Sequence, residues 1–271
     1  MTVSCMMDDY CPRRGLRGEH GLSLFLQAGD FSVIFDTGQG GRFMENAADM
    51  GIDLREARAI VLSHGHYDHC GGLGKLRERL APDCPPIYAG RGWDAPKMAR
   101  DAGGLVDIGQ VRSADSKPTA AVVVESLTSI APGIFLLPAV ARPADSADNP
   151  RFRTVDGRGE TVDRFEDELS LVVVEEDGLT VIAGCAHRGI LNIAAAALQA
   201  FPGKVLKTLA GGFHLADAAE DALAAVASGL AGLEPGRVLC SHCTGPRGYA
   251  ALLAALGNRV TWLSCGMRVR A

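Results

Sequence analysis

Three histidines and an aspartate lie within six consecutive positions of this chain, directly after an apolar run. His64, His66, Asp68 and His69 follow the segment 59–62, which is Ala-Ile-Val-Leu. Imidazole and carboxylate side chains bind divalent cations such as zinc at roughly 2.0 to 2.2 Å, and a loop can bring several of them to one point. Since the whole chain has only seven histidines, a chance cluster of solvated side chains is a poor explanation. The pattern predicts a metal site at the end of a strand.

Several short segments, in a fixed order, resemble the metallo-β-lactamase superfamily, whose first motif is His-x-His-x-Asp-His. Residues 64–69 match that motif without a gap. The other matching segments are 19–23, 35–38, 184–187, 211–215 and 242–245. Together they resemble the branch typified by 7,8-dihydropterin-6-methyl-4-(ribofuranosyl)aminobenzene 5'-phosphate synthase, many members of which are simply called metal-dependent hydrolases. The resemblance implies an α/β fold, the four-layer αββα sandwich of the superfamily.

The hydrophobic pattern independently indicates a mixed α/β chain. Segments 22–27 and 31–35 are expected to be strands joined by a turn at Gly29-Asp30. Further β-rich apolar runs predict strands at 59–62, 86–89, 121–127, 134–137, 169–174, 179–183, 205–209, 237–240 and 259–263. Helical periodicity predicts helices at 41–50, 72–80, 190–200, 221–233 and 248–256.

We expect residues 1–271 to form a single domain, because a chain of this length with 47% apolar residues can bury one large core. Two stretches, 91–119 and 138–164, are rich in Asp, Arg, Gly and Pro and are expected to be inserted loops or a lid. The second stretch contains Arg142, Arg151, Arg153, Arg158 and Arg164. These arginines either form a solvated surface or include one or two that grip a phosphate group.

Composition indicates which partners to expect. A net charge of -5 with scattered basic residues gives no reason to expect nucleic-acid binding. No run of eighteen apolar residues occurs, and the first ten residues lack the apolar core of a signal peptide. The eight cysteines are scattered as reduced thiols would be. We therefore expect a cytoplasmic protein with a small-molecule substrate and no membrane partner, and the sequence does not indicate an oligomeric state.

The superfamily resemblance implies one or two divalent ions, with zinc as the first choice. His64 and His66 would hold one ion, Asp68 and His69 would turn toward a second, and His242 matches the last ligand. All of these residues precede or follow predicted strands at one edge of the fold.

Two parts of the ligand set stay open. His187 is one candidate ligand, but the Cys185 thiolate is another, unless Cys185 is merely a small buried thiol. The usual third-ligand histidine is also absent, since segment 165–169 reads Phe-Glu-Asp-Glu-Leu. A carboxylate from Asp167 or Glu168 would replace it, and that would favour manganese or iron relative to zinc.

Other residues have predicted roles in catalysis and substrate binding. Asp68 would orient a nucleophile as well as bind metal, and His214 would contact substrate or protonate a leaving group. Thr244 and Gly245 open a predicted helix, whose free N–H groups suit a phosphate. Asp36 is expected to brace the metal loop through hydrogen bonds rather than to bind metal.

The resemblance implies a metal-dependent hydrolase or transferase that acts on a small phosphorylated or pterin-like metabolite. In the synthase branch a pyrophosphate leaves as a pterin is joined to an aminobenzene ribose phosphate, whereas a hydrolase would activate water. Hydrolysis of an ester, lactone or phosphodiester unrelated to pterins is the alternative. A non-catalytic metal-binding signalling module is a second alternative, but it predicts lost ligands, and the first motif is complete.

Overall fold

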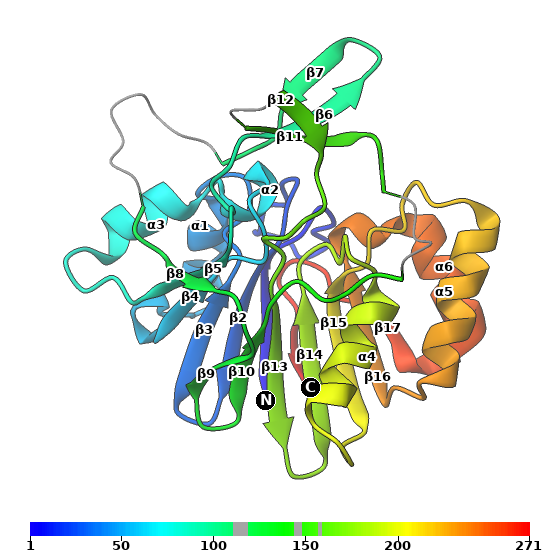
Figure 1. Ribbon diagram of the computed structural model, residues 1–271. Coiled ribbons are helices and arrows are strands. Elements are labelled where there is room, and N and C mark those ends of the chain that lie inside the picture. The colour runs from blue at the N-terminus through cyan, green and yellow to red at the C-terminus, as the bar shows by residue number, and fades with distance from the viewer. Residues whose placement is uncertain (111–118, 144–147, 157–158) are drawn as a thin grey trace.

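Two seven-stranded β-sheets lie face to face at the centre of the molecule (Figure 1). This computed structural model describes residues 1–110, 119–143, 148–156 and 159–271. The strand order in the first sheet is β18 (Arg268–Arg270), β1 (Thr2–Met7), β2 (Ser23–Ala28), β3 (Phe31–Phe35), β4 (Ala59–Val61), β5 (Ile87–Gly90) and β8 (Val122–Val124). The order in the second sheet is β17 (Val260–Trp262), β16 (Arg237–Ser241), β15 (Leu206–Gly212), β14 (Gly178–Ala183), β13 (Ser170–Glu175), β10 (Ile134–Leu137) and β9 (Thr128–Ala131).

Helices cover the outer face of each sheet, so the layers follow the order α, β, β, α (Figure 1). The first sheet carries α1 (Arg42–Asp49), α2 (Tyr67–Cys70) and α3 (Leu73–Leu80). The second sheet carries α4 (Ile190–Ala200), α5 (Glu220–Gly232) and α6 (Gly245–Leu256). Short 3₁₀ segments are η1 (Leu54–Glu56), η2 (His242–Thr244) and η3 (Gly257–Arg259). The predicted four-layer sandwich is confirmed, and no helix within the described residues is both long and apolar enough to cross a bilayer.

Strands that are covered on both faces explain the long apolar runs of the sequence. In β3, Val33 packs between the two sheets with Leu171 and Ile182, whereas the next residue, Ile34, packs beneath the helices with Phe43. Alternate side chains of a strand point to opposite faces, so a strand covered on both sides is apolar throughout.

At one edge of the sandwich, several strands end or begin next to polar residues. Strands β3 and β4 run parallel in the first sheet, as do β14, β15 and β16 in the second. Strand β2 is antiparallel to both β1 and β3, so the end of β1 and the start of β2 reach the edge where β3 ends. Polar segments that are far apart in the sequence therefore meet there.

Some strands do not follow from the local sequence pattern. The stretches 91–119 and 138–164 were expected to be loops or a lid, but their described residues include four strands, which form a small sheet above the sandwich (Figure 1). Its strand order is β12 (Gly159–Val162), β11 (Phe152–Asp156), β6 (Lys97–Asp101) and β7 (Gly104–Asp107). The pairing of β6 with β11 joins the two stretches across a long sequence separation, which a local pattern does not reveal. Strands β1 and β18 were also not predicted, and the segment expected as one strand at 121–127 contains only the short β8.

A buried lysine attaches the small sheet to the sandwich. Lys97, the first residue of β6, is 3% exposed, and its Nζ lies 2.8 Å from Asp163 and 2.7 Å from Asp167. The second oxygen of Asp167 accepts a hydrogen bond from the backbone N–H of Gly65 at 2.8 Å. This ion cluster connects the small sheet directly to the loop that carries the first histidine motif.

We predict that Lys97→Met lowers the free energy of unfolding by about 3–5 kcal/mol, because Asp163 and Asp167 would remain buried without their cation. Urea unfolding followed by circular dichroism measures the change. Lys75→Met, at an exposed position, is the matched control and should change the free energy of unfolding by less than about 0.5 kcal/mol. Equal stability of the two variants would contradict the proposed role of Lys97.

Candidate metal centre

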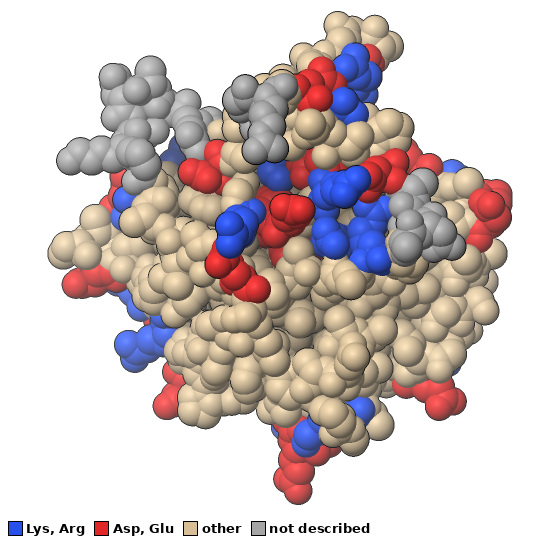
Figure 2. Space-filling view, viewed as in Figure 1, with Lys and Arg blue, Asp and Glu red and all other residues tan. Residues whose placement is uncertain are grey.

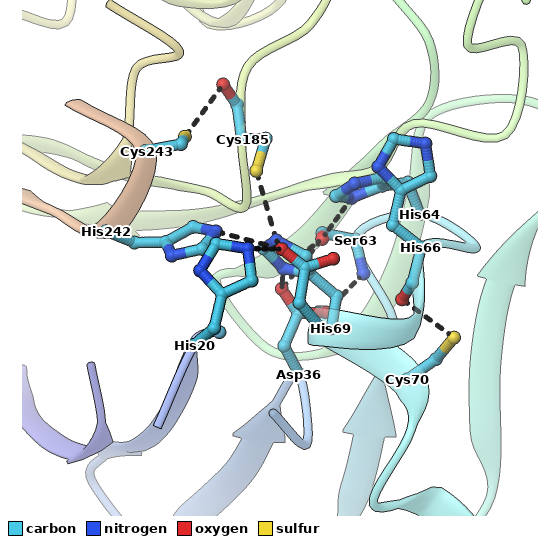
Figure 3. Close-up of polar contacts among 12 residues, drawn as sticks. His20, Asp36, Ser63, His64, His66, His69, Cys70, Cys185, His242 and Cys243 are labelled. Atoms are coloured by element: carbon cyan, nitrogen blue, oxygen red, sulfur yellow. Dashed lines mark hydrogen bonds and ion pairs between the residues drawn. The ribbon is translucent and has the colours of Figure 1, made fainter. Parts of the chain in front are cut away.

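All seven histidines of the chain gather at the polar edge of the sandwich, and Figure 3 shows five of them. Each has at least one other histidine ring with a centroid within 5.1 Å. Six of the rings form a row in which each contacts the next, and the seventh, His66, lies beside His64. The order in the row is His20, His242, His69, His64, His187 and His214. The sandwich therefore concentrates the imidazoles of the chain in one place.

Asp36 holds both ends of the loop that carries the first motif (Figure 3). It directly follows β3, and its carboxylate accepts hydrogen bonds from the backbone N–H and the hydroxyl of Ser63, each at 2.7 Å. The same carboxylate lies 2.7 Å from Nδ1 of His69. Gly65 is required inside the loop, because a Cβ there would lie 1.8 Å from the carbonyl oxygen of Trp93. These contacts agree with the bracing role predicted for Asp36.

His64, His66 and His187 form the first group of candidate ligands. The ring centroids of His66 and His187 lie 4.5 and 4.9 Å from that of His64. The Nε2 atom of each ring is buried and has no hydrogen-bond partner among the described residues. Burial lowers the pKa of His66 to about 3, and it also lowers the pKa of His64 and His187 well below the ordinary value. The three rings are therefore neutral, and their buried lone pairs lack a partner.

The third imidazole of this group comes from His187, not from a replacement carboxylate. Glu168 uses both of its oxygens elsewhere, because they accept the backbone N–H groups of His187 at 2.6 Å and Arg188 at 3.0 Å. Asp167 is likewise occupied by Lys97 and Gly65. These contacts do not support Asp167 or Glu168 as the predicted replacement ligand, nor the preference for manganese or iron that rested on it. Glu168 instead positions the turn that presents His187.

Asp68, His69 and His242 form the second group. Oδ2 of Asp68 lies 3.3 Å from Nε2 of His242 and 3.7 Å from Nε2 of His69. Nδ1 of His242 lies 2.8 Å from Asp9, and Nδ1 of His69 lies 2.7 Å from Asp36. A histidine that binds metal through one nitrogen usually donates the other N–H to a carboxylate, which fixes the ring. Both rings have that arrangement.

Cys185 lies between the two groups (Figure 3). Its sulfur is 3.0 Å from Nε2 of His69. Its sulfur is also close to donor atoms of His64 and His187 on one side, and to those of His69 and His242 on the other. Burial raises the pKa of the thiol, so a free thiolate there is unfavourable unless a cation stabilises it. The structure thus brings Cys185 and His187 to the centre together, whereas the sequence left a choice between them.

Asp9 and His20 also reach this centre, although neither was in the predicted ligand set. Nε2 of His20 lies 3.3 Å from Oδ2 of Asp68, and its Nδ1 lies 3.0 Å from Asp9. Asp9 follows β1 and His20 precedes β2, so the antiparallel pairing of these strands brings both residues to the edge. The predicted hairpin of strands 22–27 and 31–35 could have revealed His20. In a hairpin the start of the first strand lies beside the end of the second, so His20 is expected near Asp36.

A pocket of about 960 Å³ opens above the two groups. Donor side chains from both groups form its floor, among them His66, Asp68, Cys185 and His242. Aromatic side chains line its walls: Tyr10, Tyr67, Phe152, Tyr249 and Trp262. A large apolar pocket with a few converging polar groups is the usual form of a small-molecule site.

Of the predicted substrate contacts, His214 and Gly245 line the pocket and Thr244 does not. The ring centroid of His214 lies 4.4 Å from that of His187, which agrees with a position beside bound substrate. Thr244 is buried, and its hydroxyl accepts the backbone N–H of Phe213 at 3.1 Å. Its side chain therefore ties the start of α6 to the end of β15. The backbone N–H of Gly245 donates to the carbonyl oxygen of His242, so it is not a free donor for the predicted phosphate.

Among the described arginines of the second inserted stretch, only Arg151 lines the pocket. Arg142 pairs with Asp148 at 2.9 Å and Arg153 with Glu160 at 2.6 Å, and Arg164 also faces Asp148. Arg158 lies outside the described residues. Figure 2 shows basic and acidic side chains mixed below the small sheet rather than gathered into one basic face. Most of these arginines thus form a surface of ion pairs, as one of the two interpretations predicted.

Divalent metal ions fit this donor set. The donors are of the types found in transition-metal sites. They include three buried Nε2 atoms without partners, the Asp68 carboxylate oxygen beside imidazole nitrogens, and the Cys185 sulfur between the two groups. Without a cation, the burial of so many unpartnered acceptors would be costly.

The family model of the metallo-β-lactamase superfamily matches residues 16–189, which is more than half of the chain. The chain belongs to the metallo-β-lactamase superfamily.

Proteins of named function that are similar to this chain agree with that assignment. The chain is 25% identical over 241 residues to 7,8-dihydropterin-6-methyl-4-(β-D-ribofuranosyl)-aminobenzene-5'-phosphate synthase from Methanocaldococcus jannaschii, covering 84% of this chain and 81% of the synthase. The crystal structure of Tm1679, a metal-dependent hydrolase of the β-lactamase superfamily, is similar with a TM-score of 0.84 and 27% identity, covering 100% of this chain and 99% of that one. The short form of human tRNase Z shares the fold with a TM-score of 0.57 at 16% identity, covering 100% of this chain and 99% of that one.

We predict that Asp36→Asn weakens metal binding by about 10–100-fold, because an amide cannot accept hydrogen bonds from both Ser63 and His69 through two oxygens. Competition with a chromophoric chelator measures the dissociation constants. Asp30→Asn, in an exposed turn, is the control, and thermal melts of the metal-free proteins show whether the fold persists. If a folded Asp36→Asn protein binds metal as tightly as the control, the bracing role of Asp36 is wrong.

Proposed function

We propose that this protein is a metal-dependent hydrolase or transferase that acts on a small phosphorylated or pterin-like metabolite. The observation that carries the proposal is the position of two adjoining donor groups at the floor of one aromatic-walled pocket. Zinc is the preferred ion, because imidazole nitrogen and thiolate sulfur are its usual ligands.

The residues divide into two metal-holding groups. His64, His66 and His187 would hold one ion, and Asp68 and its neighbouring imidazoles would hold a second; the Cys185 sulfur lies between these two groups of residues. Bound divalent ions supply Lewis acidity, which polarises a phosphoryl or carbonyl oxygen and lowers the pKa of a water molecule. Asp68, whose carboxylate lies at the pocket floor, orients the attacking group toward the substrate.

The walls of the pocket suit a flat ring that carries an anionic group. Phe152 and Trp262 offer aromatic faces to a planar substrate. Arg151, beside Phe152, offers a guanidinium to a phosphate. His214 stands at the pocket wall to contact the substrate or protonate a leaving group.

Two reactions remain candidates because each is supported by a different relative. The similar synthase is named for a product that contains a pterin, an arylamine and a ribose phosphate, which favours group transfer onto an amine. Tm1679 is described as a hydrolase, which favours attack by water. The mixed surface charge and the net charge of -5 favour a small-molecule substrate over a nucleic acid.

Product analysis with and without an amine acceptor separates the two reactions. The zinc-loaded protein is incubated with a pyrophosphate ester of a pterin alcohol, alone or with an arylamine ribose phosphate, and the products are identified by mass spectrometry. A coupled product that appears only with the amine indicates a transferase, whereas a pterin alcohol in both samples indicates a hydrolase.

We predict that His66→Ala lowers the rate of either reaction by at least about 100-fold. Removing a residue that only hydrogen-bonds to a metal ligand already costs about 10–100-fold in activity, and His66 is itself a proposed ligand.

Thermal melts of the metal-free proteins show whether His66→Ala stays folded, because the buried ring also packs against Phe152, Phe165 and His187. Unchanged turnover in folded His66→Ala protein would refute the metal-dependent mechanism. Absence of any reaction with pterin, ester, lactone and phosphodiester substrates would refute the proposed substrate classes.

We predict that Arg151→Met raises KM for a phosphorylated substrate by roughly 10–100-fold and leaves kcat nearly unchanged, because it removes a charge-assisted hydrogen bond of about 1.5–3 kcal/mol. Steady-state kinetics measure both constants. Arg153→Met is the matched control, since Arg153 pairs with Glu160 and does not line the pocket. If both variants keep the wild-type KM, Arg151 does not bind the phosphate.

A further inference from the structure

The rings of His20 and His242 lie side by side (Figure 3), and both face two carboxylates, Asp9 and Asp68. Their Nδ1 atoms face the two oxygens of Asp9, His20 at 3.0 Å and His242 at 2.8 Å. Their Nε2 atoms both lie 3.3 Å from the same oxygen of Asp68. The two rings thus have the same contacts, although His20 precedes β2 in the first sheet and His242 follows β16 in the second.

The contacts of Asp9 determine which ring nitrogen carries the lone pair. A carboxylate accepts hydrogen bonds, so Nδ1 of each ring donates its N–H to Asp9. In a neutral imidazole Nε2 then carries the lone pair. Each Nε2 faces the same Asp68 oxygen, so without a cation each ring would hold a proton there. A bound cation would replace those protons and meet both nitrogen lone pairs and the carboxylate oxygen. A cation shared by all three atoms would satisfy this arrangement.

The distances among these atoms match the spacing of metal ligands. Ligand atoms at about 2.1 Å from an ion in tetrahedral geometry lie roughly 3.4 Å apart. The two Nε2–Oδ2 separations of 3.3 Å agree with that spacing. A metal-binding histidine usually donates its remote N–H to a carboxylate, and Asp9 accepts such a hydrogen bond from both rings.

Asp9 is itself held in place. Its Oδ1 also accepts the backbone N–H of Gly21 at 3.0 Å, next to His20. The backbone N–H of His242 donates to the neighbouring carboxylate of Asp8 at 2.7 Å. The segment after β1 therefore positions both rings, which gives the N-terminal strand a role at the metal centre.

We infer that His20 is a direct ligand of the second metal ion through Nε2, beside Asp68 and His242, with Asp9 as the carboxylate that orients both rings. The inference rests on the metal centre of the proposed function. It extends the second site into the N-terminal part of the chain, to a histidine outside the His-x-His-x-Asp-His motif. The ligand that this site takes is a divalent transition-metal cation.

Equilibrium dialysis with Co²⁺ tests the inference without any substrate. Wild-type protein should bind two ions per chain. His20→Ala should bind the first ion normally and the second at least about 10-fold more weakly, with changed visible absorption bands of the bound Co²⁺. Free imidazole should restore those bands by filling the space of the missing ring. Tyr10→Ala truncates a neighbouring pocket-lining side chain that has no donor in either group, and it should bind both ions as wild type does.

The outcomes distinguish this inference from the proposed function. Two ions with wild-type affinity and unchanged absorption bands in His20→Ala would overturn the ligand role of His20 and leave the metal centre standing. A wild-type protein that binds only one ion, unaffected by His20→Ala, would overturn it as well. Failure of the wild-type protein to bind any Co²⁺ or Zn²⁺ would instead refute the proposed function.

Discussion

The buried carboxylate of Asp36 is the contact on which the arrangement of the centre most depends. It receives Ser63 at the start of the motif loop and His69 at its end, so the loop closes around one anchor at the end of β3. From that anchor the loop directs His64 and His66 to one side and Asp68 to the other. The second sheet completes each side with residues that follow β14 and β16. The function of the fold is thus to align strand ends from two sheets on both sides of one loop.

Burial gives the two groups different electrostatic environments. The first consists of neutral imidazoles, with the pKa of His66 lowered to about 3 by burial, and its unpartnered nitrogens need a cation. The second contains carboxylates that face imidazoles, and Asp68 and Asp9 raise the pKa of His20 to about 9. Both environments favour a cation, one because lone pairs lack partners and the other because negative charge is concentrated. The small sheet contributes through Lys97 and Asp167, which hold Gly65 between the two motif histidines.

Local sequence was sufficient for the features that depend on neighbouring residues. The motif at 64–69, the bracing Asp36 and most strands of the two sheets, with β1, β9 and β18 excepted, follow from residue type and periodicity. The layer order followed from the family resemblance. Features that depend on pairing across the chain were not predicted. The small sheet joins two polar stretches, and the contacts that occupy Asp167 and Glu168 come from distant segments. Asp9 and His20 reach the centre only because β1 and β2 pair beside β3. Thr244 was predicted to offer helix N–H groups to a phosphate, and the sequence did not show that its hydroxyl binds Phe213 at the end of β15.

Anomalous diffraction from crystals grown with zinc is the most direct measurement of whether the strand-end histidines form a metal centre. Data collected on both sides of the zinc absorption edge locate the bound ions without reference to activity. We expect two anomalous peaks, one among Nε2 of His64, His66 and His187 and the other beside Asp68 and His242, with the Cys185 sulfur between them. Fully ordered side chains with no anomalous peak at either group, in zinc-saturated crystals, would contradict the metal centre.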